Sequence, residues 1–62
     1  MCLSTVYRNE MTEATVVMKN VMKIECKEGQ VILTDLMDRT VTITGVLQEA
    51  NLVDDFVIVK EN

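Results

Sequence analysis

Cys2 is the residue of this sequence whose position gives it the clearest potential for metal chemistry. If the initiator methionine is removed, which a small second residue usually permits, Cys2 carries both the α-amine and the thiol. These two groups together form a five-membered chelate ring with a metal ion. The backbone amide of Leu3 can add a second nitrogen, and a thiolate with nitrogen donors suits Ni(II) or Cu(II) better than Mg²⁺ or Ca²⁺. Cys2 and Leu3 are therefore the candidate metal ligands.

A two-fold dimer would supply these donors twice. Two Cys2 residues near the axis would give one metal ion two nitrogen and two sulfur ligands. The alternative is that Cys2 is an ordinary small apolar residue, frayed at the terminus or packed against a sheet. Judged from the residues alone, this second interpretation carries more weight.

The other side chains of this sequence do not favour a catalytic site. Histidine is absent, which removes the commonest catalytic base and metal ligand. The sequence contains no nucleophile elbow, phosphate-binding loop, dinucleotide-binding fingerprint, C-x-x-C or zinc-protease motif. We therefore expect a protein without catalytic activity.

The other sulfur-containing residues are predicted to have packing roles. Cys26 falls on the apolar face of a predicted strand with Met22 and Ile24, so we expect a buried structural thiol. The methionines are not closely spaced, and we expect them to pack in the core or at an interface. The residues concerned are Met11, Met18, Met22 and Met37.

We also expect the acidic and aromatic residues to have structural roles. Asp35, Asp38 and the Asp54-Asp55 pair lack the ligand density of a calcium loop, so we expect solvated turns there. Tyr7 and Phe56 are the only aromatic residues, too few for a platform on which RNA bases stack. We expect both to fill the core.

Strand signals dominate the chain, because Val, Ile and Thr recur in short runs. The predicted strands are Leu3–Tyr7, Thr15–Lys19, Val21–Cys26, Val31–Thr34, Thr40–Thr44 and Phe56–Val59. Gly29 suits a short hairpin loop, Gly45 ends the threonine-rich run, and Val46 to Val53 fits either a short helix or a strand. These elements predict an all-β fold, a small curled sheet or barrel of about six to seven short strands, in one domain covering residues 1–62.

Length and charge limit the possible partners. A chain of 62 residues buries little surface on folding, so its free energy of unfolding should be small. A homodimer is the simplest way to add stability, and we expect one. Two cysteines do not form a disulfide framework, which favours a reducing, cytoplasmic location. No apolar stretch is long enough to cross a membrane. The net charge of −4 makes nucleic acid an unfavourable partner.

The opening Met1-Cys2-Leu3-Ser4-Thr5-Val6-Tyr7 is similar to the start of the CooT family of small nickel-binding proteins. The resemblance continues through Val21–Ile24, Val31–Leu36, Leu52-Val53 and Phe56–Val59, and so spans nearly the whole chain. It implies a compact β-rich homodimer that binds nickel(II) through Cys2. In some members of the family this is connected with nickel delivery to carbon monoxide dehydrogenase.

A second functional hypothesis belongs to a different class. The expected architecture, and an older family label of predicted RNA-binding protein, are compatible with a small-barrel adaptor for RNA or for a partner protein. The acidic balance of the chain argues against the RNA version. A structural subunit without a ligand is the third possibility.

Overall fold

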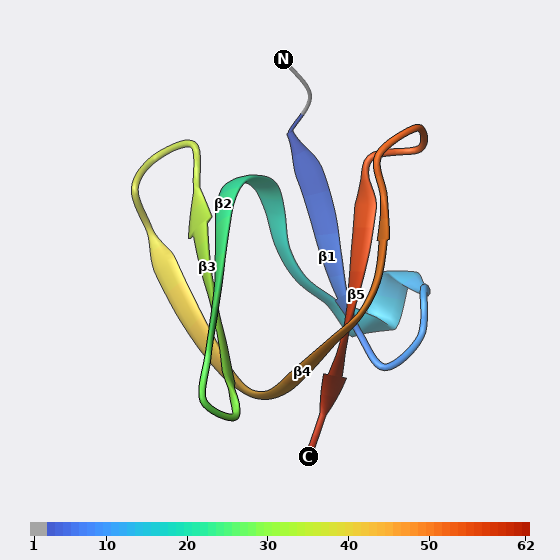
Figure 1. The fold of residues 1–62 in the computed structure, drawn as a ribbon. Coiled ribbons are helices and arrows are strands. Elements are labelled where there is room, and N and C mark those ends of the chain that lie inside the picture. The colour runs from blue at the N-terminus through green and yellow to red at the C-terminus, as the bar shows by residue number, and fades with distance from the viewer. Residues whose placement is uncertain (1–2) are drawn as a thin grey trace.

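Five strands close into one barrel in the computed structural model, which describes residues 3–62. The strands are β1 (Ser4–Arg8), β2 (Val16–Lys27), β3 (Gln30–Asp35), β4 (Thr40–Asn51) and β5 (Phe56–Glu61), with a 3₁₀ turn, η1, at Glu13–Thr15. Neighbouring strands run antiparallel from β1 to β5, and β1 closes the barrel by pairing with β5 in parallel (Figure 1). The prediction of an all-β barrel is confirmed.

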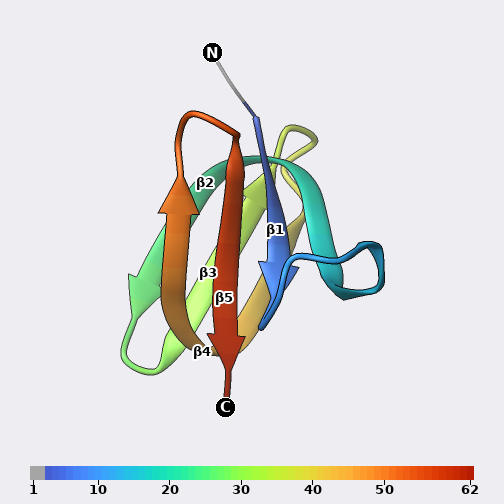
Figure 2. The ribbon, with the colours of Figure 1, turned by 90° about the vertical axis from the view of Figure 1, so that its right-hand side faces the viewer.

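The strand count is lower than predicted because two strands are long and strongly bent. The predicted strands Thr15–Lys19 and Val21–Cys26 are parts of β2, which spans twelve residues. Asn20 adopts a positive φ of 56° within β2, and the register with β3 shifts just after it. This bend lets the first half of β2 pair with β1 and its second half pair with β3 (Figure 2).

β4 is the second bent strand, and it includes the segment left undecided by the sequence. Residues 46–51 continue β4 as a strand that pairs with β5, and residues 52–55 form the turn. Gly45 lies inside β4 rather than ending it. A Cβ atom there would collide with the carbonyl oxygen of Lys60, so only glycine lets β4 and β5 approach this closely.

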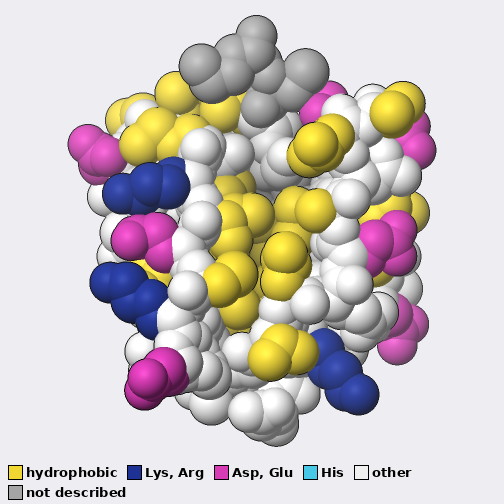
Figure 3. All heavy atoms as spheres, in the orientation of Figure 1, with side chains coloured by type: hydrophobic (Ala, Val, Ile, Leu, Met, Phe, Trp, Pro, Cys, Tyr) yellow, Lys and Arg dark blue, Asp and Glu magenta, His cyan; other side chains and the backbone are white. Residues whose placement is uncertain are grey.

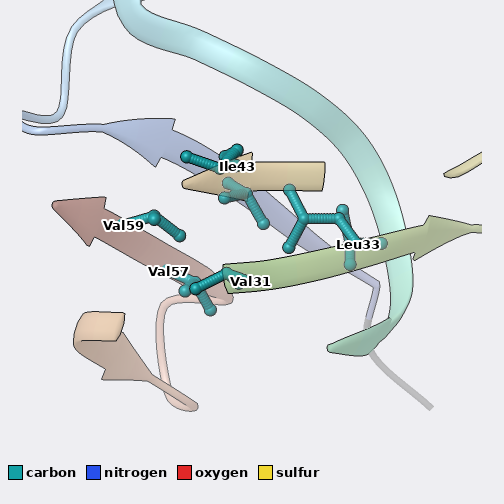
Figure 4. Close-up of a cluster of buried hydrophobic side chains, with 7 residues drawn as sticks. Val31, Leu33, Ile43, Val57 and Val59 are labelled. Atoms are coloured by element: carbon teal, nitrogen blue, oxygen red, sulfur yellow. The ribbon is translucent and has the colours of Figure 1, made fainter. Parts of the chain in front are cut away.

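Seven aliphatic side chains form the core of the barrel (Figure 4). They alternate along their strands with outward-facing residues, as a closed sheet requires. Val6, Leu33 and Val59 have no exposed surface at all. The full set is Val6, Val21, Val31, Leu33, Ile43, Val57 and Val59.

Tyr7 and Phe56 do not belong to this core, contrary to expectation. Tyr7 follows the core residue Val6 in β1 and therefore points to the outer face of the sheet. The two rings pack edge to face against each other, with centroids 6.5 Å apart and an interplanar angle of 76°. Their area therefore stabilises the outside of the β1–β5 pair rather than the interior.

Candidate functional site

β1, the strand that follows the predicted ligands, begins at one end of the barrel (Figure 1). Cys2, the principal predicted ligand, lies outside the described residues, whereas Leu3 is half-buried and directly precedes β1. Ser4 is the register partner of Val21 in β2. On the other side of β1, the Thr5 N–H donates to the carbonyl oxygen of Asp55 at 3.0 Å. The chain is thus held on both sides from Ser4 onward.

Two loops lie at this same end of the barrel, one between β3 and β4 and one between β4 and β5 (Figures 1 and 2). The β4–β5 loop is joined to β1 by the bond between Thr5 and Asp55. The β3–β4 loop is joined to β2, because the Leu36 N–H donates to the Asn20 carbonyl oxygen at 2.9 Å. Both loops therefore flank the strand that follows the predicted metal ligands.

Asp35 shapes the β3–β4 loop. Its Oδ1 accepts hydrogen bonds from the backbone N–H groups of Met37 and Arg39, both at 2.9 Å. Its Oδ2 pairs with the Arg39 side chain at 2.8 Å. These contacts hold Leu36 and Met37 on the surface, where they are 58% and 72% exposed.

Asn51 shapes the β4–β5 loop in the same way. Its Oδ1 accepts hydrogen bonds from the backbone N–H groups of Val53 at 3.0 Å and Asp54 at 2.8 Å. The loop presents Leu52 and Val53, which at 81% and 89% are the most exposed large hydrophobic residues described. We call Leu36, Met37, Leu52 and Val53 the apolar end.

The sequence carries a recognisable signal for the apolar end. Residues 35–38 read Asp-Leu-Met-Asp, and residues 51–54 read Asn-Leu-Val-Asp. In both, an Asx side chain that can cap a turn precedes two apolar residues. Turns and loops run over the protein surface, so the pattern indicates an exposed apolar pair.

Asp35 is buried at 2% exposure, and this corrects the expectation of a solvated turn residue. Burial by itself would raise the pKa of Asp35. The hydrogen bonds from Arg39 and Met37, together with the positive charge of Arg39, outweigh burial and hold the pKa below its usual value. Asp35 therefore stays ionised as a structural anchor for the loop.

The prediction of a buried Cys26 is wrong, and Met22, predicted to pack in the core or at an interface, lies outside the core. Cys26 is exposed, and Met22 is 46% exposed. The register shift between Val21 and Lys23 interrupts the alternation at Met22, so Met22 does not share the core-facing side with Val21 and Ile24. Cys26 retains a core-facing position opposite Val31, but it lies beyond Val21, where β2 no longer pairs with β1.

The described residues contain no group of three or more His, Cys, Asp and Glu side chains placed to hold a metal ion. No cavity is found within residues 3–62. In the same range, no helix is long and apolar enough to cross a membrane. This search does not include Cys2, so Cys2 and Leu3 stay predicted ligands.

Comparisons with known proteins assign the chain to a family. A crystal structure of a CooT candidate from Carboxydothermus hydrogenoformans superposes with a TM-score of 0.84 at 15% sequence identity, covering 98% of each chain. This likeness shows a shared fold. No curated protein matches the chain with significant similarity. The family model described as CO dehydrogenase accessory protein CooT matches residues 1–60. The chain therefore belongs to the CooT family of CO dehydrogenase accessory proteins.

Proposed function

We propose that this protein binds nickel(II) through Cys2 and takes part, without catalysing a reaction itself, in the nickel-dependent maturation of CO dehydrogenase. The observation that carries the proposal is the family match over residues 1–60, which includes Cys2. The family description names an accessory role toward CO dehydrogenase. Nickel is the cargo in this proposal, and the cytoplasm is where loading takes place.

The donor set fits nickel on chemical grounds. A thiolate, a terminal amine and a deprotonated backbone amide are strong-field donors that favour the planar geometry of Ni(II). The amine and the thiolate come from Cys2 after removal of Met1, and the amide comes from Leu3. Because the chain is anchored from Ser4 onward, these donors immediately precede a fixed strand.

The same proposal includes a homodimer formed through the apolar end. The apolar end exposes four hydrophobic side chains on two loops, each held by its own internal hydrogen bonds. Such a surface is unusual for a monomer of this size. A two-fold interface through this end would bury these side chains and bring two chain starts toward the axis. Two Cys2 residues could then share one nickel ion.

A Ni(II) titration of protein lacking Met1, followed by calorimetry and by thiolate-to-nickel charge-transfer absorption, tests the proposal. We expect saturable binding in the unsubstituted protein and in Cys26→Ser, which removes the other thiol of the chain. Cys2→Ser should lose both the absorption band and the binding. Unchanged stoichiometry and affinity in Cys2→Ser would end the proposal.

Two further measurements test whether the terminal amine is a ligand and whether two chains share one nickel ion. Protein that retains Met1 has an amide in place of the amine, so its nickel affinity should fall while the thiolate band persists. Intact-mass measurement identifies the two forms. A ratio of one nickel ion per two chains indicates the shared site, and one per chain indicates a site within a single chain.

A further inference from the structure

One side of the barrel has two strand edges without partners among the described residues. β2 pairs with β1 only up to Val21, so residues 22–27 have β3 as their only neighbour. β4 pairs with β3 only over Thr40–Thr44, so residues 46–51 have β5 as their only neighbour. Figures 1 and 2 agree that both segments border the face turned to the viewer in Figure 1. We call this face the open side.

The core reaches the surface at the open side. Directly opposed residues of paired strands lie on the same face of a sheet, so the partners of core residues are themselves core-facing. Leu47 is opposite Val59, which is fully buried, yet Leu47 is 42% exposed. Cys26, opposite the buried Val31, is exposed as well. Figure 3 shows a strip of hydrophobic side chains down the middle of this face.

These two features together indicate what kind of chain could cover the open side. The two edges offer backbone N–H and C=O groups, and the strip between them offers apolar surface. An extended segment with apolar side chains at alternate positions satisfies both, because its backbone pairs with an edge while every second side chain faces the core. A helix would leave the edge groups unpaired.

Charge specifies the other face of such a segment. β2 holds three of the six basic residues of the chain, Lys19, Lys23 and Lys27, but only one acidic residue, Glu25. The Nζ atoms of Lys23 and Lys27 lie 3.7 and 3.9 Å from the carboxylate oxygens of Glu25. The two lysine side chains are 58% and 63% exposed. The strand is therefore locally positive in a chain of net charge −4. Acidic side chains beside this edge would be attracted to it.

We propose that the open side binds one extended segment of a partner protein, about six residues long, with apolar side chains toward the core and acidic side chains beside Lys23 and Lys27. The occupant is a different protein rather than a second copy. If the homodimer uses the apolar end, a second and different self-interface on the open side would join copies into open-ended assemblies. The inference concerns partner binding and does not depend on nickel.

A peptide-binding experiment tests this proposal on the full chain with Cys2→Ser, which leaves Cys26 as the only thiol. The probe is a fluorescent peptide of about ten residues in which Val and Glu alternate. Its controls are the same peptide with Lys in place of Glu, and one with Pro at alternate positions to remove backbone donors. We expect the Glu peptide to bind about tenfold more tightly than either control, and to slow alkylation of Cys26.

Substitutions locate the site. Leu47→Glu should abolish binding, and the double change Lys23→Glu and Lys27→Glu should reverse the preference between the Glu and Lys peptides. Met11→Glu is the matched control, because Met11 is 53% exposed but lies in the β1–β2 connection. Thermal unfolding checks that each variant is folded. The Cys26 alkylation assay is made on protein without these substitutions, so it stays valid even if a variant does not fold.

Three results would overturn the proposal. One is that the Glu peptide does not bind or leaves the alkylation rate of Cys26 unchanged. Another is that binding persists in Leu47→Glu. The last is that, without peptide, Cys26 alkylation slows with rising protein concentration as the dimer forms, since a second copy would then cover the open side.

Discussion

The carboxylate of Asp35 lies 2.8 Å from the Arg39 Nε, and the two side chains differ sharply in burial, at 4% and 74% exposed. Asp35 also receives the backbone N–H groups of Met37 and Arg39. A single buried acid thus holds the loop that presents half of the apolar end. Its ionisation should couple the shape of this loop to pH.

Asp35→Asn should lower the stability at pH 7 and also flatten the acid dependence. The fold lowers the pKa of Asp35, so the stability that Asp35 contributes is fully present above its ordinary pKa of about 3.9 and is lost as the pH falls through the lower folded value. Urea unfolding at pH 7 and pH 3 measures this. If the free energy of unfolding falls by the same amount from pH 7 to pH 3 in Asp35→Asn and in the unsubstituted protein, Asp35 has no such role.

Asn51→Ala should destabilise the β4–β5 loop by about 1 kcal/mol, because two backbone donors lose their acceptor. Asn51→Asp retains the accepting oxygen and should preserve the loop. Hydrogen exchange of the Val53 and Asp54 amides reports the effect locally, and thermal unfolding reports it globally. If Asn51→Asp behaves like Asn51→Ala, the capping interpretation is wrong.

The two glycines should differ in how they respond to alanine. At Gly45 an added Cβ meets the Lys60 carbonyl oxygen, so Gly45→Ala should cost about 1–3 kcal/mol through displacement of β4 from β5. At Gly29 the space is open but φ is 67°, so Gly29→Ala should cost about 1–2 kcal/mol from backbone strain alone. Gly29→Asn is the control, because Asn tolerates this conformation. The atom met at Gly45 belongs to the backbone and cannot rotate away, so Gly45→Ala should lie at the upper end of its range and be the most damaging of the three in urea unfolding.

The double substitution Leu52→Asp and Val53→Asp should convert the proposed homodimer to a monomer. Both side chains are more than four-fifths exposed, so the fold of the monomer should be almost unaffected. Light scattering coupled to gel filtration measures the mass, with Met11→Asp as the control at an exposed site away from the apolar end. A dimer that survives the double substitution would place the interface elsewhere.

Several features of the fold could be predicted from residue types alone. The runs of Val, Ile and Thr located every strand, and Gly29 marked the β2–β3 hairpin, because β-branched residues and a positive φ act locally. The number of strands could not be predicted. Asn20 and Gly45 looked like interruptions in the sequence, but each lies within a long strand whose bend is stabilised by pairing with two different neighbours.

By itself, the sequence determined the all-β class, the family and the candidate ligands Cys2 and Leu3, since these depend on composition, local conformation and the order of residues near the start. Only the tertiary structure decided what surrounds the start of β1. The pairing of β1 with both β2 and β5 brings loops that are distant in sequence to one end of the barrel, where Leu36, Met37, Leu52 and Val53 are exposed. Tertiary structure also decided that Cys26 is exposed, because alternation along a strand assigns a face but cannot say whether another strand covers it.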